Sequence, residues 1–71
     1  MEKLSAEDRA YRDIIQLILS GQFRPGDFLL EVDLAPRLEM SRTPVSRALG
    51  RLVAEGFLNK MPKKGCYIPF P

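Results

Sequence analysis

Turn-forming residues divide this chain into short segments, which restricts it to a fold of short elements. Pro25-Gly26 and the run from Pro62 to Gly65 have the composition of tight turns, and Gly21 and Gly56 fit the ends of helices. A single domain of 71 residues buries only about 60% of its unfolded surface. The sequence therefore predicts one domain over residues 1–71, with a small core and no deep pocket.

The composition argues against several classes of protein. With 45% hydrophobic and 28% charged residues, the chain is typical of a globular domain, and no apolar run reaches the roughly 18 residues of a membrane span. The first ten residues lack the apolar core of a signal peptide, so we expect a cytoplasmic location and no membrane partner. A single cysteine, Cys66, and no histidine leave no disulfide, no Cys/His metal set and no imidazole base. We therefore expect no enzyme, no metal and no cofactor.

Charge is unevenly distributed along the chain, although the net charge is only +2. Residues 1–34 contain four Lys/Arg against seven acids, a net charge of −3. Residues 35–71 contain seven Lys/Arg against two acids, a net charge of +5. This asymmetry indicates a polyanionic partner for the second half.

The first predicted helix runs from about Ser5 to Ser20. Ser5 and Asp8 resemble a capping box, and Gly21 follows the helical pattern. Apolar residues at helical spacing give this helix one face toward the core. That face comprises Tyr11, Ile14, Ile15 and Ile18.

A short strand or bridge is predicted at residues 27–30, followed by a second helix from about Glu31 to Leu38. Pro36 is tolerated only where backbone N–H groups are unpaired, as in a first turn. We therefore expect this helix to be short and to start late, near residues 32–33. A turn at Glu39-Met40 then leads to the third helix.

The third predicted helix runs from about Arg42 to Glu55. Ser41 is a good N-cap, Pro44 falls in the first turn where its missing N–H costs little, and Gly56 fits the left-handed end. Its buried stripe comprises Val45, Leu49, Leu52 and Val53.

Two short strands, Phe57 to Met61 and Cys66 to Pro69, are predicted to form a hairpin around the turn at residues 62–65. The fold class is therefore mainly α with a small β-hairpin (α+β). We expect the apolar side of the hairpin to cover the helical core. This side comprises Phe57, Leu58, Tyr67, Ile68 and Phe70.

The start of the third helix has the chemistry of a DNA contact. A helix of this kind fits the major groove, and its N-terminal residues reach the base edges. Free N–H groups and a partial positive charge favour phosphate oxygens there, and Ser41, Thr43 and Ser46 add hydroxyl donors. Arg42 is unusual in a first turn, where acids are favoured, but it suits a polyanion facing this end and can pair with guanine.

Further basic residues are candidates for contacts to the DNA backbone. Arg47 and Arg51 stand four residues apart on one side of the helix, where they could follow a phosphate strand; the alternative is that each is a solvated surface arginine. Lys63 and Lys64 occupy the hairpin tip, and Gly65 permits a close approach to the backbone or the minor groove. A solvated turn is the alternative for the tip.

Several motifs occur together between about Tyr11 and Ile68. They are Pro25-Gly26-Asp27, Leu34-Ala35, Ser41-Arg42-Thr43-Pro44-Val45, Ala48-Leu49, Arg51-Leu52, Glu55-Gly56 and Gly65. In this combination the chain resembles the N-terminal winged helix-turn-helix domain of the GntR family of bacterial transcriptional regulators, and within it the FadR-like subgroup.

The resemblance implies a three-helix core with a β-hairpin wing. It also implies sequence-specific binding to double-stranded DNA, at a palindromic operator and as a homodimer, under the control of a small-molecule effector. The effector-binding and dimerisation domain of such regulators is absent from this chain, which we expect to be a fragment; the alternative is a stand-alone domain. The family's DNA contacts fall, by position, on Arg42, Thr43, Pro44, Lys64 and Gly65.

The chain departs from the family pattern at three positions. Ser46 stands where an arginine is usual and Arg47 where a glutamate is usual, so the contact expected there passes to Arg47 or is lost with a change in operator preference. Glu39 replaces the usual turn glycine and places a carboxylate in the helix-turn-helix turn.

Two other functions stay open at this point. A winged-helix module for protein–protein assembly would show an exposed apolar patch on the third helix, which the arginines argue against. A DNA-binding accessory domain fused to an enzyme is the other, because some members of the family are fused to an aminotransferase-like domain.

Overall fold

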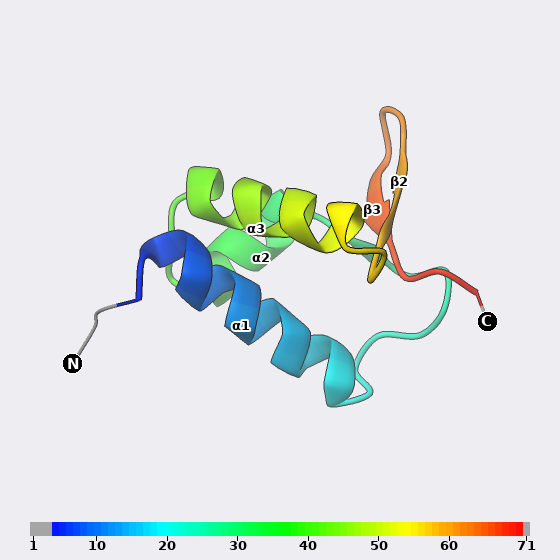
Figure 1. Cartoon of the computed structure of the whole chain (residues 1–71), viewed down its shortest axis with the longest axis horizontal. Coiled ribbons are helices and arrows are strands. Elements are labelled where there is room, and N and C mark those ends of the chain that lie inside the picture. Colours follow the sequence, from blue (N-terminus) through cyan, green and yellow to red (C-terminus); the bar gives the residue numbers. More distant parts are fainter. Residues whose placement is uncertain (1–3, 71) are drawn as a thin grey trace.

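The computed structural model describes residues 4–70, so residues 1–3 and 71 of the predicted domain lie outside the described range. Three helices and a small antiparallel sheet make up the fold (Figure 1), which confirms the predicted class and the winged helix-turn-helix arrangement. The elements in chain order are α1 (Ala6–Leu19), β1 (Phe28–Leu29), α2 (Glu31–Arg37), α3 (Arg42–Ala54), β2 (Asn59–Met61) and β3 (Gly65–Tyr67).

Helix α1 begins and ends as its sequence predicts. The Ser5 side chain accepts a hydrogen bond from the backbone N–H of Asp8 at 3.0 Å, and Gly21 follows the helix with a φ of 84°. Ala10 and Ile14 on its inner face are fully buried. The helix is thus fixed at its start by a cap and along its length by the core.

Helix α2 begins at Glu31, so the prediction of a late start was wrong. The Leu30 carbonyl accepts the N–H groups of both Asp33 and Leu34, at 3.1 and 2.9 Å, and closes the first turn around Leu30. Pro36 therefore lies in the last turn of a seven-residue helix. A helix this short has little regular hydrogen bonding left for the proline to interrupt.

The turn between α2 and α3 is a regular helix-ending motif. The N–H of Met40 donates to the carbonyl of Ala35 at 2.9 Å, and that of Glu39 donates to Pro36 at 3.1 Å. The motif requires a left-handed residue, and Glu39 supplies it with a φ of 56°. A side chain with a Cβ thus occupies a position that favours glycine.

Helix α3 packs against both α1 and α2 with its inner face. Four residues of this face are buried, and Val53 at its edge is partly buried. The helix ends at Ala54, one residue before the predicted end, and Gly56 closes it with a φ of 86°. The buried residues are Val45, Ala48, Leu49 and Leu52.

The sheet has the strand order β1-β3-β2, so the hairpin gains β1 as a third strand. Cys66 pairs with Leu29 on one side and with Lys60 on the other. Strand β2 is shorter than predicted because the N–H groups of Phe57 and Leu58 both donate to the carbonyl of Leu52 and end α3 instead.

The prediction that the hairpin's apolar side covers the core is right only in part. Leu58 is fully buried and Ile68 packs against the core, but Phe57 and Phe70 are 57% and 71% exposed. Phe57 stands where the chain reverses after α3, and the ring of Phe70 lies against the turn at Gly26. Both aromatic rings are thus outside the core.

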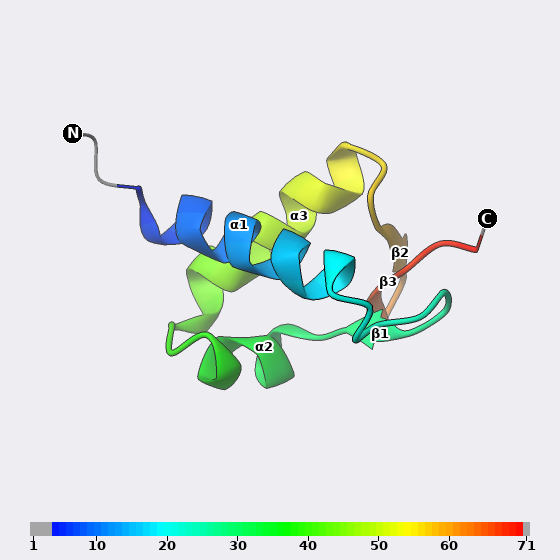
Figure 2. The same ribbon diagram turned by 90° about the horizontal axis from the view of Figure 1, so that it is seen from below.

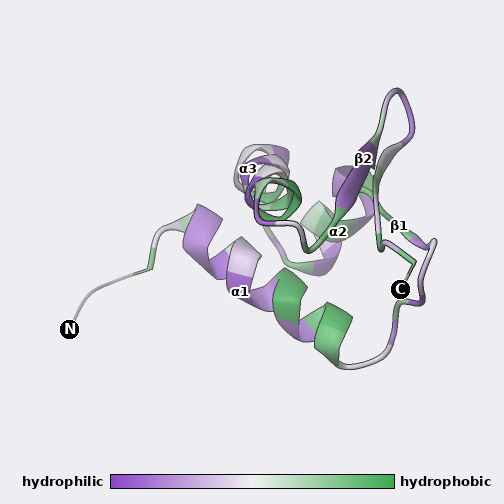
Figure 3. Ribbon diagram, turned by 45° about the vertical axis from the view of Figure 1, so that its right-hand side comes forward, coloured by the Kyte–Doolittle hydropathy of each residue, from purple (hydrophilic) through white to green (hydrophobic). Residues whose placement is uncertain are grey.

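Helix α3 packs against the other two helices, and the sheet stands at one end of the three (Figure 2). The largest fully buried side chains are those of Ile14, Leu29, Leu52, Leu58 and Val45. Coloured by hydropathy, the hairpin is mainly hydrophilic toward its tip, whereas the second half of α1 is hydrophobic (Figure 3). Within residues 4–70, no helix is long and apolar enough to cross a membrane.

Candidate nucleic-acid interface

The start of α3 is open to solvent and lacks a side-chain cap. Ser41 occupies the N-cap position in an extended conformation, but its hydroxyl makes no capping hydrogen bond. The first turn contains no acidic residue. The unpaired N–H groups and the positive end of the helix dipole are therefore available to an anion.

Four of the predicted site residues meet at this helix start. Arg42, Thr43, Ser46 and Arg47 are exposed and line one shallow hollow, which we call the α3 surface. Glu31 at the start of α2 completes the hollow, and its Oε1 lies 3.8 Å from the Nε of Arg42. The Arg42 side chain is still 64% exposed, so this weak ion pair leaves the guanidinium free to contact a ligand.

Pro44 lies on a different side of α3 from this hollow and is half-buried. Backbone N–H groups in a first turn have no partner within the helix, so the missing N–H of a proline costs little there. The fixed φ of the proline also favours the helical conformation. Its contribution is therefore to the shape of the first turn.

Arg47 and Arg51 do not lie side by side on this surface. The Nη1 of Arg51 donates to Asp8 Oδ1 at 3.0 Å and to Glu7 Oε2 at 3.3 Å, both on α1. Hydrogen bonding to Asp8 raises the pKa of Arg51 above its usual value. The structure thus gives Arg51 an intramolecular role, and the prediction that it follows a phosphate strand beside Arg47 has no support in this geometry.

The wing places two exposed lysines at the tip of the β2–β3 hairpin. The N–H of Lys64 donates to the carbonyl of Met61 at 3.0 Å, and Lys63 is in the left-handed region with a φ of 66°. Proline followed by a left-handed residue is typical of a type II turn. In Figure 1 the tip extends beyond α3, on the side away from α1.

Packing within the domain requires a glycine at position 65. Its φ is 116°, and a Cβ at this position would lie 2.6 Å from the Cδ2 of Leu30. The missing side chain therefore lets the wing pack on the strand segment before α2. Close approach to DNA is not needed to explain it.

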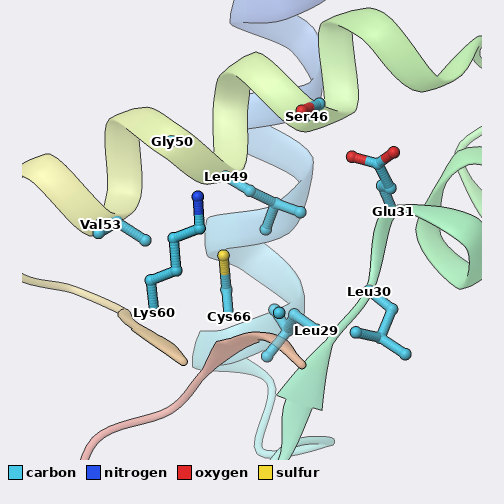
Figure 4. A pocket seen from close by; sticks show the side chains of 10 residues that line it. Leu29, Leu30, Glu31, Ser46, Leu49, Gly50, Val53, Lys60 and Cys66 are labelled. Atoms are coloured by element: carbon cyan, nitrogen blue, oxygen red, sulfur yellow. The ribbon is translucent and has the colours of Figure 1, made fainter. Parts of the chain in front are cut away.

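A cleft of about 360 Å³ separates α3 from the sheet (Figure 4). The Lys60 side chain extends from β2 toward α3 beside the sulfur of Cys66, and the carboxylate of Glu31 faces Ser46 across the cleft. Burial raises the pKa of the Cys66 thiol, although the nearby Lys60 opposes the shift. Cys66 is therefore a neutral, buried thiol of the wing strand.

Sequence reasoning missed Lys60 and Glu31 as neighbours of the site. In the strand predicted from Phe57 to Met61, Lys60 stands two residues after the apolar Leu58, so strand alternation would have placed both on the side that faces α3. No comparable signal exists for Glu31, because its proximity to Arg42 depends on how α2 crosses α3. Among the described residues, no three His, Cys, Asp or Glu side chains form a group that could hold a metal ion.

Comparison with known protein families agrees with this geometry. The model of bacterial regulatory proteins of the gntR family matches residues 6–68. The chain belongs to the gntR family. It is a GntR-type DNA-binding domain, and three helices with a small antiparallel sheet are its winged-helix fold.

Individual relatives of this GntR domain are longer than the chain. The Nta operon transcriptional regulator of Aminobacter aminovorans is 47% identical over 51 residues, which are 72% of this chain and 24% of that protein. The chain thus spans about a quarter of that relative. E. coli McbR/YncC is similar in structure, with a TM-score of 0.83 and 33% identity over 94% of this chain and 32% of that one.

A further solved structure, AraR(DBD) in complex with operator ORR3, is similar with a TM-score of 0.81. It is 24% identical and covers 94% of this chain and 82% of that one. At this identity the likeness shows the shared fold.

Proposed function

We propose that this domain is the part of a bacterial transcriptional regulator that recognises a DNA sequence, with α3 in the major groove and the wing on the backbone or in the minor groove. The α3 surface is the observation that supports it most. Arginines and hydroxyls gather there, at an uncapped helix start without an acidic residue. Such a surface offers a charged donor for a base edge, and a second charged donor with several hydroxyls for phosphate oxygens.

Each residue of the surface has a proposed contact. Arg42 pairs with the O6 and N7 of a guanine, while the hydroxyls of Ser41, Thr43 and Ser46 and the guanidinium of Arg47 bind phosphates. After Arg47, α3 carries a glycine at position 50, which has no side chain to reach a base. A Cβ added at Gly50 would meet open space, so this position lies on the outer face of the helix. Base contacts therefore concentrate in the first half of the helix.

The wing supplies backbone contacts in this proposal. Lys63 and Lys64 at the tip bind phosphates or the edge of the minor groove, and Lys60 reinforces the positive potential at the base of the wing. Pro44 and Gly65 shape the helix start and the hairpin. Arg51 stays with α1 and takes no part in binding.

The regulator as a whole is proposed to be a homodimer that binds a palindromic operator. The length of the relatives supports a further part of the protein beside this domain, since the domain occupies 24% of one relative and 34% of another. We place effector binding and dimerisation in the remaining part, and we assign the chain to the FadR-like subgroup on the motif that starts at Ser41. A role in DNA binding implies a cytoplasmic protein without catalytic activity in this domain.

Selection of bound sequences from random duplexes tests the proposal. The domain is mixed with a pool of random double-stranded DNA at low and at moderate salt, and the bound fraction is sequenced. We expect a short enriched motif, each half of which contains a guanine that Arg42→Ala no longer selects. Arg12→Ala, an exposed substitution on α1, is the matched control and should leave the motif unchanged.

Two results would contradict the proposal. One is binding that does not depend on salt, because phosphate contacts release counterions and weaken as salt rises. The other is an enriched motif that is identical for the natural domain and for Arg42→Ala. In that case the base contact would lie elsewhere on the domain.

A further inference from the structure

Four apolar side chains, two of them exposed and two partly buried against the core, form a patch around the C-terminal end of α1, which we call the α1 patch. Ile15, Ile18, Leu19 and Phe57 line a shallow hollow of about 170 Å³. Leu19 is 79% exposed and Phe57 is 57% exposed. In Figure 3 this half of α1 is hydrophobic, in contrast to its first half. Leu19 and Phe57 thus leave apolar surface that a protein partner can cover.

The α1 patch lies away from the DNA-binding elements. In Figure 1 the wing tip and the outer face of α3 are on one side of the molecule, and α1 is on the other. A partner on the patch and a duplex on the α3 surface therefore do not compete for space.

The patch is nevertheless connected to both DNA-binding elements through Phe57. The N–H of this residue donates to the carbonyl of Leu52 at 2.9 Å and ends α3. Two residues later, β2 begins at Asn59. A partner that contacts the Phe57 ring thus touches the joint between the recognition helix and the wing.

The C-terminal segment packs on the loop that connects α1 to β1. The N–H of Ile68 donates to Asp27 at 3.0 Å, and the N–H of Gly26 donates to Ile68 at 2.7 Å. Phe70 then lies against Gly26, in the loop that directly follows α1. Figure 2 shows the end of α1 and the segment after β3 in the same half of the molecule. A polypeptide that continues after Phe70 therefore starts beside the loop that follows α1.

We propose that the α1 patch is the docking site for the domain that follows in the full-length regulator, an inference that rests on the proposed two-part architecture. Four side chains are too few for the interface between two free copies, because stable interfaces bury about 1,200–2,000 Å². A tethered domain needs far less area, since a short linker gives it an effective concentration in the millimolar range. Docking there couples the second domain to the recognition helix and the wing.

Hydrogen–deuterium exchange of the full-length regulator and of the 71-residue chain tests this inference. We expect slower exchange of the backbone amides of residues 15–20 and 57–58 in the full-length protein. Leu19→Glu should abolish this difference. Leu4→Glu, which alters an exposed leucine before α1, is the matched control and should leave the protection intact. Thermal unfolding of the 71-residue variants checks that each still folds.

Three outcomes would overturn the inference. Equal exchange in the two proteins would show that nothing covers the patch. A dimer of the 71-residue chain that Leu19→Glu disperses, seen by analytical ultracentrifugation, would make a second copy the occupant. A natural protein that ends at residue 71 would remove the docking domain. Operator binding by the 71-residue chain is measured separately, so failure of the docking site and failure of the DNA-binding proposal can be told apart.

Discussion

The guanidinium of Arg51 lies over the ring of Tyr11, 4.1 Å from the ring centroid. The same arginine donates hydrogen bonds to Glu7 and Asp8, and the Tyr11 hydroxyl donates to the carboxylate of Glu55. One polar cluster thus fastens the second half of the recognition helix to the first half of α1. In the proposed function, these contacts are the reason why Arg51 of α3 takes no part in DNA binding.

Substitution of Arg51 should affect stability more than DNA binding. Arg51→Gln removes the two ion pairs and the cation–π contact, and we expect the Tm to fall by a few degrees. Arg47→Gln should do the reverse, with an unchanged Tm and weaker binding to the selected operator. Thermal unfolding and fluorescence anisotropy measure the two effects. Weaker binding by Arg51→Gln at an unchanged Tm would contradict the intramolecular role.

Acid should destabilise the domain in part through Asp8. Hydrogen bonds from Ser5 and then from Arg51 lower the pKa of this carboxyl in the folded state. The unfolded value is about 3.9, so the stabilisation is present above that pH and is lost as the pH falls through the lower folded value. Between about pH 5 and pH 2, the Tm of Asp8→Asn should therefore fall less than the Tm of the natural chain. Asp13→Asn on the same helix, which has no contact to Arg51, should behave like the natural chain.

The turn of the helix-turn-helix should be improved by a glycine. Glu39 has a left-handed backbone, with a φ of 56°, where a Cβ is unfavourable. Glu39→Gly should raise the free energy of unfolding by about 0.5–1 kcal/mol, after the entropy that glycine adds to the unfolded chain is subtracted. Urea titrations measure it. Glu39→Ala is the control, because it removes the carboxylate but retains the Cβ, and an equal gain there would assign the effect to charge.

The wing lysines should contribute affinity without sequence preference. Lys64→Ala should weaken binding to every duplex by a similar factor and reduce the slope of log K against log salt by about 1. Arg42→Ala should instead cost roughly 1–3 kcal/mol on the selected operator and less on random DNA. Anisotropy titrations at several salt concentrations separate the two behaviours. A loss at Lys64 that is confined to the operator would contradict the assignment to the backbone.

The sequence predicts most of the fold because its signals are local. Helical spacing from Val45 to Leu52 and glycine at position 56 locate α3 to within one residue. The early start of α2 escaped prediction, since the Leu30 carbonyl closes the first turn without any capping side chain. The prediction relied on Pro36, which is best tolerated in a first turn, and it therefore placed the start of α2 too late.

The candidate site was predictable only where its residues are neighbours in the chain. Arg42, Thr43, Ser46 and Arg47 share a surface because one helix carries them. The partners of Arg51 are 43 and 44 residues away, so nothing near Arg51 in the chain announces that it faces α1. Phe57 is likewise exposed because the chain reverses after α3. The hydrophobicity of the residue gives no sign of this exposure.

Strand β3 lies in the middle of the sheet, bonded to β2 on one side and to β1 on the other. Because β1 is followed directly by α2, the wing is joined to the helix-turn-helix by hydrogen bonds as well as by the chain. The spacing between Lys64 and Arg42 is therefore a property of the protein that a duplex has to match. DNA whose grooves differ from this spacing must bend or twist to make both contacts, at a cost that depends on its base steps. In the proposed complex, bases that no side chain touches would thereby influence which operator is chosen.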